Sequence, residues 1–194
     1  MSEVYIDYKL TDRIYLTSEI RYTSFTDLDL KLTISIRVMS NTKKLVVISH
    51  APSENTKRML DAVIQGASSH DLDNIDVRYI SPLDTRPDDI KTADAIIIGT
   101  TENLGYMAGL IKDVFDRCYY ECLDYTQGLP FTFYVRAGLD GTGTKRAIES
   151  ITTGLRWRLV QEPLICKGEF KEEFITQCEE LGLTIAASLD AGII

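Results

Sequence analysis

The chain has 194 residues, of which 44% are hydrophobic and 26% are charged. This composition is typical of one globular domain with room for a smaller additional segment. The formal net charge of -8 would repel nucleic acid, and no basic cluster in the sequence offsets it. No apolar run reaches the roughly eighteen residues of a spanning helix, and the N-terminus lacks the order of a secretory signal. We therefore expect a cytoplasmic protein that binds neither nucleic acid nor membrane.

Residues 1–38 form the first part of the chain. They are rich in tyrosine, threonine and isoleucine and alternate in part between apolar and polar residues, which indicates strands without clear turns between them. Two interpretations compete. The segment is an N-terminal extension that packs on the following domain or on a partner, or it is a misassigned leader upstream of a true start at Met39. The second is preferred, because "MSNTKKLVVIS" opens a domain compactly.

From Lys43 onward, strand-like apolar runs alternate with segments of helical period. This alternation predicts an α/β fold, in which a parallel sheet is covered by helices on both faces. Five strands are expected, at residues 44–49, 75–80, 94–99, 130–136 and 161–166. The first and third are nearly continuous in apolar residues, as is typical of central parallel strands.

The segments between these strands place their apolar residues on one side, which predicts amphipathic helices. The expected helices cover residues 54–67, 107–122, 144–158 and 170–189. A shorter helix is expected at "PDDIKTA", because Pro87 opens it and acidic residues follow in the first turn. A domain of five strands alternating with helices results for residues 39–194.

The cysteines and histidines of the chain predict no metal site. The four cysteines are too few for a stabilising disulfide framework and are expected as thiols: Cys118, Cys122, Cys166 and Cys178. Cys118 and Cys122 could form a redox or metal pair, but both fall on an apolar helical stripe, which favours core packing. His50 and His70 are expected to lie on the surface or in loops.

The stretch "SHAPSENT", residues 49–56, follows the first expected strand of the domain. Ligands of open α/β sheets bind at the carboxyl ends of the strands, and exposed backbone N–H groups at a helix start suit a phosphate. The hydroxyls of Ser49, Ser53 and Thr56 and the amide of Asn55 could donate further hydrogen bonds. A helix capped by Ser53 without any ligand explains the stretch equally well. The motifs GxxxxGK[ST] and GxGxxG are absent after this strand, which disfavours a P-loop NTPase or a dinucleotide-binding domain.

Two segments resemble a known family. From about Lys43 to its end the chain resembles the flavodoxin-like superfamily, and more narrowly the NAD(P)H-dependent FMN reductases and quinone reductases. "SHAPSENT" is similar to the family's hydroxyl-rich loop ending in Asn-Thr, which holds the FMN 5′-phosphate. "GTTENLGYMAGLIKDVFDR", residues 99–117, is similar to the family's Gly-Thr-Pro-Thr-aromatic-aromatic-Gly-Asn-Met stretch, which wraps the isoalloxazine ring.

The second segment matches this pattern in part. The matching residues are Gly99, Thr100, Gly105, Met107, Gly109 and Lys112. The departures are Thr101 for proline, Glu102 for threonine, Asn103 and Leu104 for the two aromatic residues, and Tyr106 for asparagine. The resemblance implies that residues 100–107 line the flavin. It also implies a third flavin loop after the fourth strand, "AGLDGTG", where Gly138 and Gly141 let backbone N–H groups approach the ring edge.

The resemblance implies a three-layer flavodoxin-like sandwich with strand order 2-1-3-4-5 and FMN as cofactor. The expected function is electron transfer from NAD(P)H to a quinone, a flavin or a similar acceptor. Because the N5 atom of the flavin does the chemistry, no catalytic side chain is expected. The alternatives are a flavodoxin-type one-electron carrier without its own substrate site and a fold relative that has lost its flavin. The expected partner is a small-molecule acceptor or a redox protein, and a homodimer is left open.

Overall fold

The computed structural model describes the chain except residues 1, 10–13, 23–30, 39–41, 70–71 and 73. The expected start at Met39 and the loop residue His70 lie outside the described residues. The chain divides into two compact units, Met1–Thr42 and Lys43–Ile194. Within the described residues, no helix combines the length and the apolar character needed to cross a membrane.

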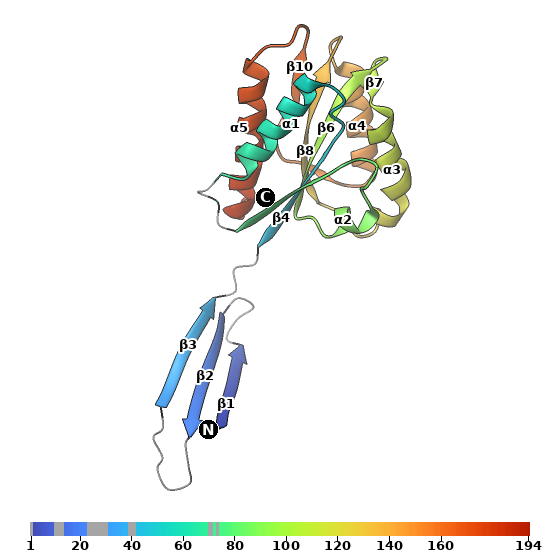
Figure 1. Cartoon of the computed structure of the whole chain (residues 1–194). Coiled ribbons are helices and arrows are strands. Elements are labelled where there is room, and N and C mark those ends of the chain that lie inside the picture. Colours follow the sequence, from blue (N-terminus) through green and yellow to red (C-terminus); the bar gives the residue numbers. More distant parts are fainter. Residues whose placement is uncertain (1, 10–13, 23–30, 39–41, 70–71, 73) are drawn as a thin grey trace. The chain divides into compact units, whose positions relative to one another are not determined.

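The first unit contains a three-stranded antiparallel sheet. Its strands are β1 (Ser2–Lys9), β2 (Ile14–Tyr22) and β3 (Lys31–Val38), and β2 lies in the middle (Figure 1). The register is regular across all three strands, since Val4 pairs with Ile20 and Ile20 pairs with Leu32. The partial alternation of the sequence therefore corresponds to paired strands in this part of the chain.

The second unit is built on a parallel sheet in the order β10-β8-β6-β4-β5. The bounds of these strands are β4 (Lys43–Ser49), β5 (Ile75–Ile80), β6 (Ala95–Asn103), β8 (Pro130–Ala137) and β10 (Leu164–Lys167). Numbered along the domain, this order is 2-1-3-4-5, so the expected fold is confirmed. Two short strands were not expected: β7 (Tyr106–Met107), which pairs with β6, and β9 (Arg158–Leu159), which pairs with β8.

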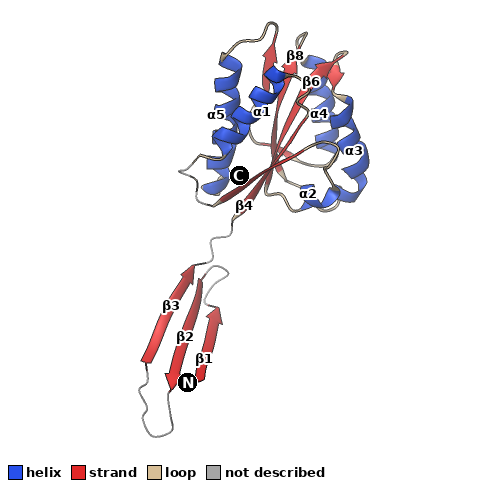
Figure 2. Cartoon of the chain, viewed as in Figure 1, coloured by secondary structure: helices blue, strands red, loops and turns tan. Residues whose placement is uncertain are grey.

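Helices cover both faces of this sheet (Figures 1 and 2). Their bounds are α1 (Glu54–Ala67), α2 (Pro87–Lys91), α3 (Gly109–Cys122), α4 (Thr142–Gly154) and α5 (Glu173–Asp190). One hydrophobic cluster joins the sheet to α1 and α5, and another joins it to α2, α3 and α4. The result is a three-layer α/β sandwich.

The central strands are apolar along their whole length because they pack on both layers of helices. In β4, Leu45 and Val47 face the cluster under α1 and α5, whereas Val46 and Ile48 face the cluster under α3 and α4. All four are almost fully buried. Each such side chain contributes roughly 1.5–3 kcal/mol to folding. Strand β4 is thereby fixed at the centre of the sheet, and the loop that follows it is held at one edge.

Helices α1 and α5 lie side by side with their backbones in close approach. A Cβ added at Gly66 would lie 1.9 Å from the carbonyl oxygen of Glu179, and one at Gly182 would lie 2.1 Å from that of Val63. Only glycine fits at these two positions. Reciprocal glycines thus determine how closely the two helices pack.

Helix α4 is shorter than the sequence predicts, since it ends at Gly154 instead of residue 158. The chain leaves the helix through Arg156, which has a φ of 59°. This turn buries Trp157, whose indole Nε1 donates to Thr126 Oγ1 at 2.8 Å. The residues after it, Arg158–Leu159, then pair with β8 as strand β9. Burial of the indole therefore overrides the helical pattern of this segment.

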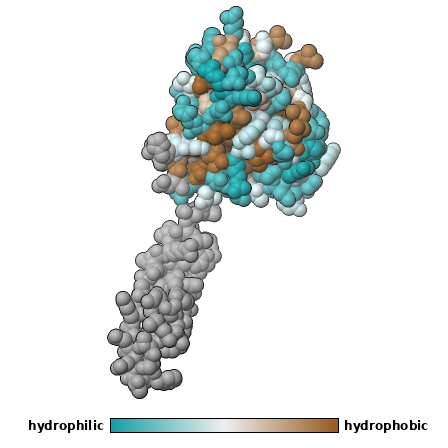
Figure 3. Space-filling model, viewed as in Figure 1, coloured by the Kyte–Doolittle hydropathy of each residue, from teal (hydrophilic) through white to brown (hydrophobic). Residues whose placement is uncertain are grey.

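Hydrophilic residues cover most of the face of the Lys43–Ile194 unit that Figure 3 shows, and apolar residues reach it in separate groups. Among the large apolar residues of this unit that are exposed, several belong to loops or turns at the carboxyl edge of the sheet: Leu83, Leu104 and Leu139. Exposed apolar residues at the carboxyl edge of a parallel sheet are placed where α/β proteins bind their ligands.

Candidate functional site

Three loops meet at the carboxyl edge of the parallel sheet. They follow β4, β6 and β8, which are neighbouring strands. The register aligns these strands, because Ser49 at the end of β4 pairs with Gly99 of β6 and Gly99 pairs with Tyr134 of β8. Strands β6 and β8 run past this level, to Asn103 and Ala137, in the same direction. The sequence-predicted residues on all three loops therefore lie at one edge.

The first loop ends in a capping box at the start of α1. The backbone N–H of Ser53 donates to Thr56 Oγ1 at 2.9 Å, and the backbone N–H of Thr56 lies 3.4 Å from Ser53 Oγ. Thr56 is buried, and its hydroxyl donates to the carbonyl of Ser53 at 2.8 Å. The helix cap that the ligand-free interpretation requires is therefore present, and Thr56 belongs to that cap.

The same helix start keeps donors for an anion. In the described part of the chain, the backbone N–H groups of Glu54 and Asn55 have no hydrogen-bond partner, as is usual in a first helical turn. Ser53 and Asn55 are exposed beside them. These N–H groups, the helix dipole and the Asn55 amide form a donor set that suits a phosphate. The Ser53 hydroxyl lies 3.0 Å from Thr56 Oγ1 and donates within the cap, because the Thr56 hydroxyl donates to the Ser53 carbonyl. The carboxylate of Glu54 opposes the set with one negative charge.

Ser49 lies beneath this loop, in the interior. Its Oγ is 2.8 Å from the hydroxyl of Tyr134, and both residues are buried. A Cβ at Gly99 would lie 2.3 Å from Ser49 Oγ, so a glycine is required where β6 passes this pair. Burial raises the pKa of Tyr134, which keeps its hydroxyl protonated. Ser49 was predicted at the phosphate, whereas Tyr134 was not predicted, because its only signal is a hydroxyl in a mostly apolar strand that also holds Thr132 and Arg136.

His50 follows Ser49 at the edge of the sheet. Its backbone N–H donates to the carbonyl of Gly99 at 3.0 Å, which extends the β4–β6 pairing by one residue. Partial burial lowers the pKa of the His50 imidazole, so the ring is neutral at neutral pH. It adds no positive charge beside the helix start.

The second loop is a β-hairpin. Strand β6 runs to Asn103 and turns at Leu104 and Gly105, which have φ values of 54° and 74°. The chain returns through β7, with Asn103 opposite Tyr106. Two successive positive φ angles are typical of a tight hairpin turn, and glycine suits the second. The tip therefore presents Leu104 fully exposed and Tyr106 about two-fifths exposed.

The base of this hairpin is fixed from inside. Thr100 is buried, and its Oγ1 accepts the backbone N–H of Ala108 at 3.0 Å. Met107 is buried in the cluster under α3 and α4. Thr101 lies further out, where its hydroxyl donates to Asn103 Oδ1 at 3.0 Å. Of the predicted ring-binding residues, Thr100 and Met107 thus hold the hairpin in place.

The third loop is tied to the hairpin by Glu102. The carboxylate of Glu102 accepts the backbone N–H groups of Leu139 at 2.7 Å and Gly141 at 3.2 Å. Gly141 precedes α4 with a φ of 74°. Sequence reasoning assigned the N–H groups of this loop to the flavin edge, and the structure pairs two of them with Glu102. No signal in the sequence indicates this contact, because the partners are more than thirty residues apart.

The start of α4 also packs against the hairpin turn. A Cβ at Gly143 would lie 2.1 Å from the carbonyl oxygen of Gly105. A surface pocket of about 330 Å³ adjoins this contact, and its lining includes Tyr106, Gly143, Arg146 and Ile151. Nothing lies within 4 Å of a Cβ at Gly138, so that position is open. The hairpin, the third loop and the start of α4 thus form one connected surface.

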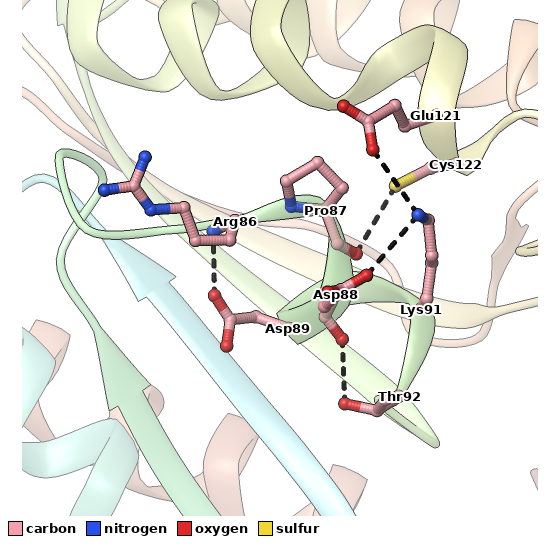
Figure 4. Close-up of polar contacts among 8 residues, drawn as sticks. All are labelled: Arg86, Pro87, Asp88, Asp89, Lys91, Thr92, Glu121 and Cys122. Atoms are coloured by element: carbon pink, nitrogen blue, oxygen red, sulfur yellow. Dashed lines mark hydrogen bonds and ion pairs between the residues drawn. The ribbon is translucent and has the colours of Figure 1, made fainter.

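The cysteine pair on α3 lies in the core. Cys118 and Cys122 are almost fully buried, and Cys122 Sγ lies 3.8 Å from the carbonyl oxygen of Pro87 (Figure 4). Burial raises the pKa of Cys122 to about 11, so the thiol is neutral at physiological pH. Beside it, the ammonium of Lys91 bridges Asp88 at 3.4 Å and Glu121 at 3.5 Å, which joins α2 to α3. Among the described residues, no group of three or more His, Cys, Asp or Glu side chains could hold a metal ion.

Comparison with known proteins identifies the fold. No protein-family model matches the chain. A flavodoxin from Aquifex aeolicus is 29% identical over 112 residues, so the match spans 58% of this chain and only 60% of that relative. An archaeal flavodoxin structure superposes with a TM-score of 0.62 at 22% identity, covering 75% of this chain and 98% of its own. A flavodoxin, WrbA-like protein from Agrobacterium tumefaciens gives 0.58 at 17% identity, covering 78% and 98%. The fold is flavodoxin-like, as the resemblance implied.

Proposed function

We propose that the chain binds FMN at the carboxyl edge of its parallel sheet. The observation that carries this proposal is the start of α1, where among the described residues the backbone N–H groups of Glu54 and Asn55 have no hydrogen-bond partner, beside exposed Ser53 and Asn55. This donor set fits a phosphate. The similarity of the fold to flavodoxins supports FMN as the molecule that carries the phosphate.

The isoalloxazine ring would lie against the hairpin and the third loop. The exposed hairpin tip, Leu104 and Tyr106, offers an apolar and an aromatic surface to a planar ring. The carboxylate of Glu102 lies in the same region and already accepts hydrogen bonds from two backbone N–H groups of the third loop. The phosphate half of the site therefore fits FMN as it stands. At the ring edge, Leu139 and Gly141 could donate to the flavin only if Glu102 moved.

The bound flavin would supply the redox chemistry, and the residues of the chain would bind and orient it. Thr100 and Met107 hold the base of the hairpin, and Gly143 holds its turn. We further propose an oxidoreductase that passes electrons from NAD(P)H to a quinone, a flavin or a similar acceptor. The supporting observation is the hairpin tip, where Asn103 and Leu104 stand in place of two aromatic residues. A smaller tip leaves more of one ring face open to a nicotinamide.

A one-electron carrier of the flavodoxin type is the second candidate, and the Aquifex aeolicus and archaeal flavodoxins support it. Mixing the FMN-loaded chain with NADPH or NADH without oxygen separates the two. The enzyme proposal expects loss of the oxidised flavin absorbance within seconds and continued nicotinamide oxidation when a quinone is added. If neither nicotinamide reduces the flavin, while a flavodoxin reductase does, the carrier is correct.

The phosphate site is tested by Asn55→Ala, with Gln65→Ala as the matched control. Both residues are exposed side-chain amides of α1, but Asn55 lies in the first turn and belongs to the proposed donor set, whereas Gln65 lies in the last turn. A hydrogen bond to a charged group contributes about 1.5–3 kcal/mol, so Asn55→Ala should weaken FMN binding about tenfold to a hundredfold. Riboflavin binding should not change in either variant. Equal losses for FMN and riboflavin would place Asn55 outside the phosphate site.

A further inference from the structure

The three-stranded sheet of the Met1–Thr42 unit separates apolar and polar residues between its two faces. Paired residues of an antiparallel sheet share a face, and neighbouring residues of a strand take opposite faces. In the observed register, the even-numbered residues of all three strands share one face. They are apolar or aromatic except Ser2 and Ser18. Three rows cross all three strands on this face: Val4, Ile20 and Leu32; Ile6, Ser18 and Ile34; and Tyr8, Leu16 and Ile36.

The odd-numbered residues share the other face and are mostly charged or polar. Both signs of charge occur there, and Glu3 lies opposite Arg21 in the register. A face of this kind is typical of contact with water. Its mixed charge gives it no preference for a polyanion or for an acidic membrane. Only the even-numbered face therefore requires a cover.

A single sheet of this size cannot bury its own apolar face. The described residues of the unit form three strands and no helix, so these residues supply one layer, whereas stable domains bury apolar faces between two layers. Units of about 40 residues usually need a disulfide, a metal or association with another chain. The four cysteines of the chain all lie after residue 117, so a disulfide within the unit is excluded.

We propose that this even-numbered face is a homodimer interface, on which the same face of a second copy of the chain packs. The three strands have nearly equal lengths of 8, 9 and 8 residues, so the face is an even rectangle that matches itself under twofold symmetry. Two such sheets stacked face to face form a β-sandwich whose core is apolar except at Ser18 on the central strand.

The area of the face supports a dimer. Strands of this length and spacing give a rectangle of roughly 27 Å by 14 Å, and the relief of a pleated surface about doubles its accessible area. This gives about 800 Å² for each partner, which is the size of a standard stable interface. The interface would also be more apolar than that of a transient complex, as is typical of permanent homodimers.

The test compares two neighbouring positions of β3 in the full-length chain, Ile34→Glu and Ser35→Glu. Ile34 lies on the even-numbered face and pairs with Ser18, whereas Ser35 lies on the opposite face and pairs with Thr17. Mass is measured by light scattering after gel filtration over a hundredfold range of concentration. The proposal expects a dimer for the unsubstituted chain and for Ser35→Glu. Ile34→Glu should dissociate at least a hundredfold more readily, because an unpaired carboxylate in an apolar interface costs several kcal/mol.

A second variant is needed because Ile34→Glu could unfold the sheet as well as weaken the dimer. Ile34→Thr keeps a β-branched residue in the strand and should still weaken the dimer about tenfold. Three results would overturn the proposal. The unsubstituted chain could be a monomer at all concentrations, which would mean that its own second unit or an unrelated partner covers the face. Both Ile34 variants could remain dimers of unchanged affinity. Ser35→Glu could dissociate as readily as Ile34→Glu.

Discussion

Gly143→Ala is the substitution that tests most sharply whether the hairpin is held by the start of α4. The added Cβ would lie 2.1 Å from the carbonyl oxygen of Gly105, and real contacts of this kind are rarely shorter than 3.4 Å. The hairpin turn and the helix must therefore separate by about 1 Å, which is the overpacking that typically costs 1–3 kcal/mol. Gly109→Ala, at the first residue of α3, is the matched control, because nothing lies within 4 Å of its added Cβ.

Alanine usually stabilises a helix relative to glycine by about 1 kcal/mol, so the two variants should change stability in opposite directions. We expect Gly109→Ala to leave the free energy of unfolding unchanged or to raise it slightly. Gly143→Ala should lower it by about 1–2 kcal/mol, which lowers the melting temperature by about 2–8 °C for a unit of this size. Thermal unfolding followed by circular dichroism measures both values.

Gly143→Ala should also weaken the binding of FMN and of riboflavin by the same factor, because in the proposed site the displaced hairpin would contact the ring and not the phosphate. Fluorescence titration with both flavins measures that factor. If Gly143→Ala were as stable as Gly109→Ala and bound both flavins normally, the position of the hairpin would not depend on the start of α4.

Two further predictions concern the interior and the domain boundary. Tyr134→Phe should lower the free energy of unfolding by about 1–3 kcal/mol, because it leaves Ser49 Oγ buried without a partner. Most of that loss should return in the double variant with Ser49→Ala, and chemical denaturation that shows purely additive losses would contradict the assigned hydrogen bond. Deleting residues 1–38 should leave a cooperatively unfolding monomer that still binds FMN, since the parallel sheet and its helices lie downstream. A calorimetric scan without a cooperative transition would make the first segment part of that fold.

The five parallel strands could be predicted because their signal is local, whereas their order was expected only from the family resemblance. Strand β4 is a continuous apolar run, which a strand buried on both faces requires, and α1 begins and ends at the residues expected from its pattern. The end of α4 could not be predicted in the same way. Trp157 takes its place through contacts with a distant segment, and those contacts override the helical period.

The site was predictable in its location and much less so in its contacts. The loops fall at one edge because parallel strands have their carboxyl ends at the same edge of the sheet, which follows from topology alone. The hairpin was missed because its turn carries leucine at a positive φ, where asparagine or aspartate would have been a signal. The contacts of Glu102 and of Ser49 join residues from different strands, and only the folded chain brings these partners together.

Equilibrium titration of the flavin-free chain with FMN and with riboflavin tests the central proposal most directly. The donors at the start of α1 address the phosphate, so FMN should bind at least tenfold more tightly than riboflavin, and the bound FMN should show a shifted visible absorbance band. Inorganic phosphate should compete with FMN and leave riboflavin unaffected. Equal affinity for the two flavins, or no binding of either, would contradict the proposal that this edge of the sheet is an FMN site.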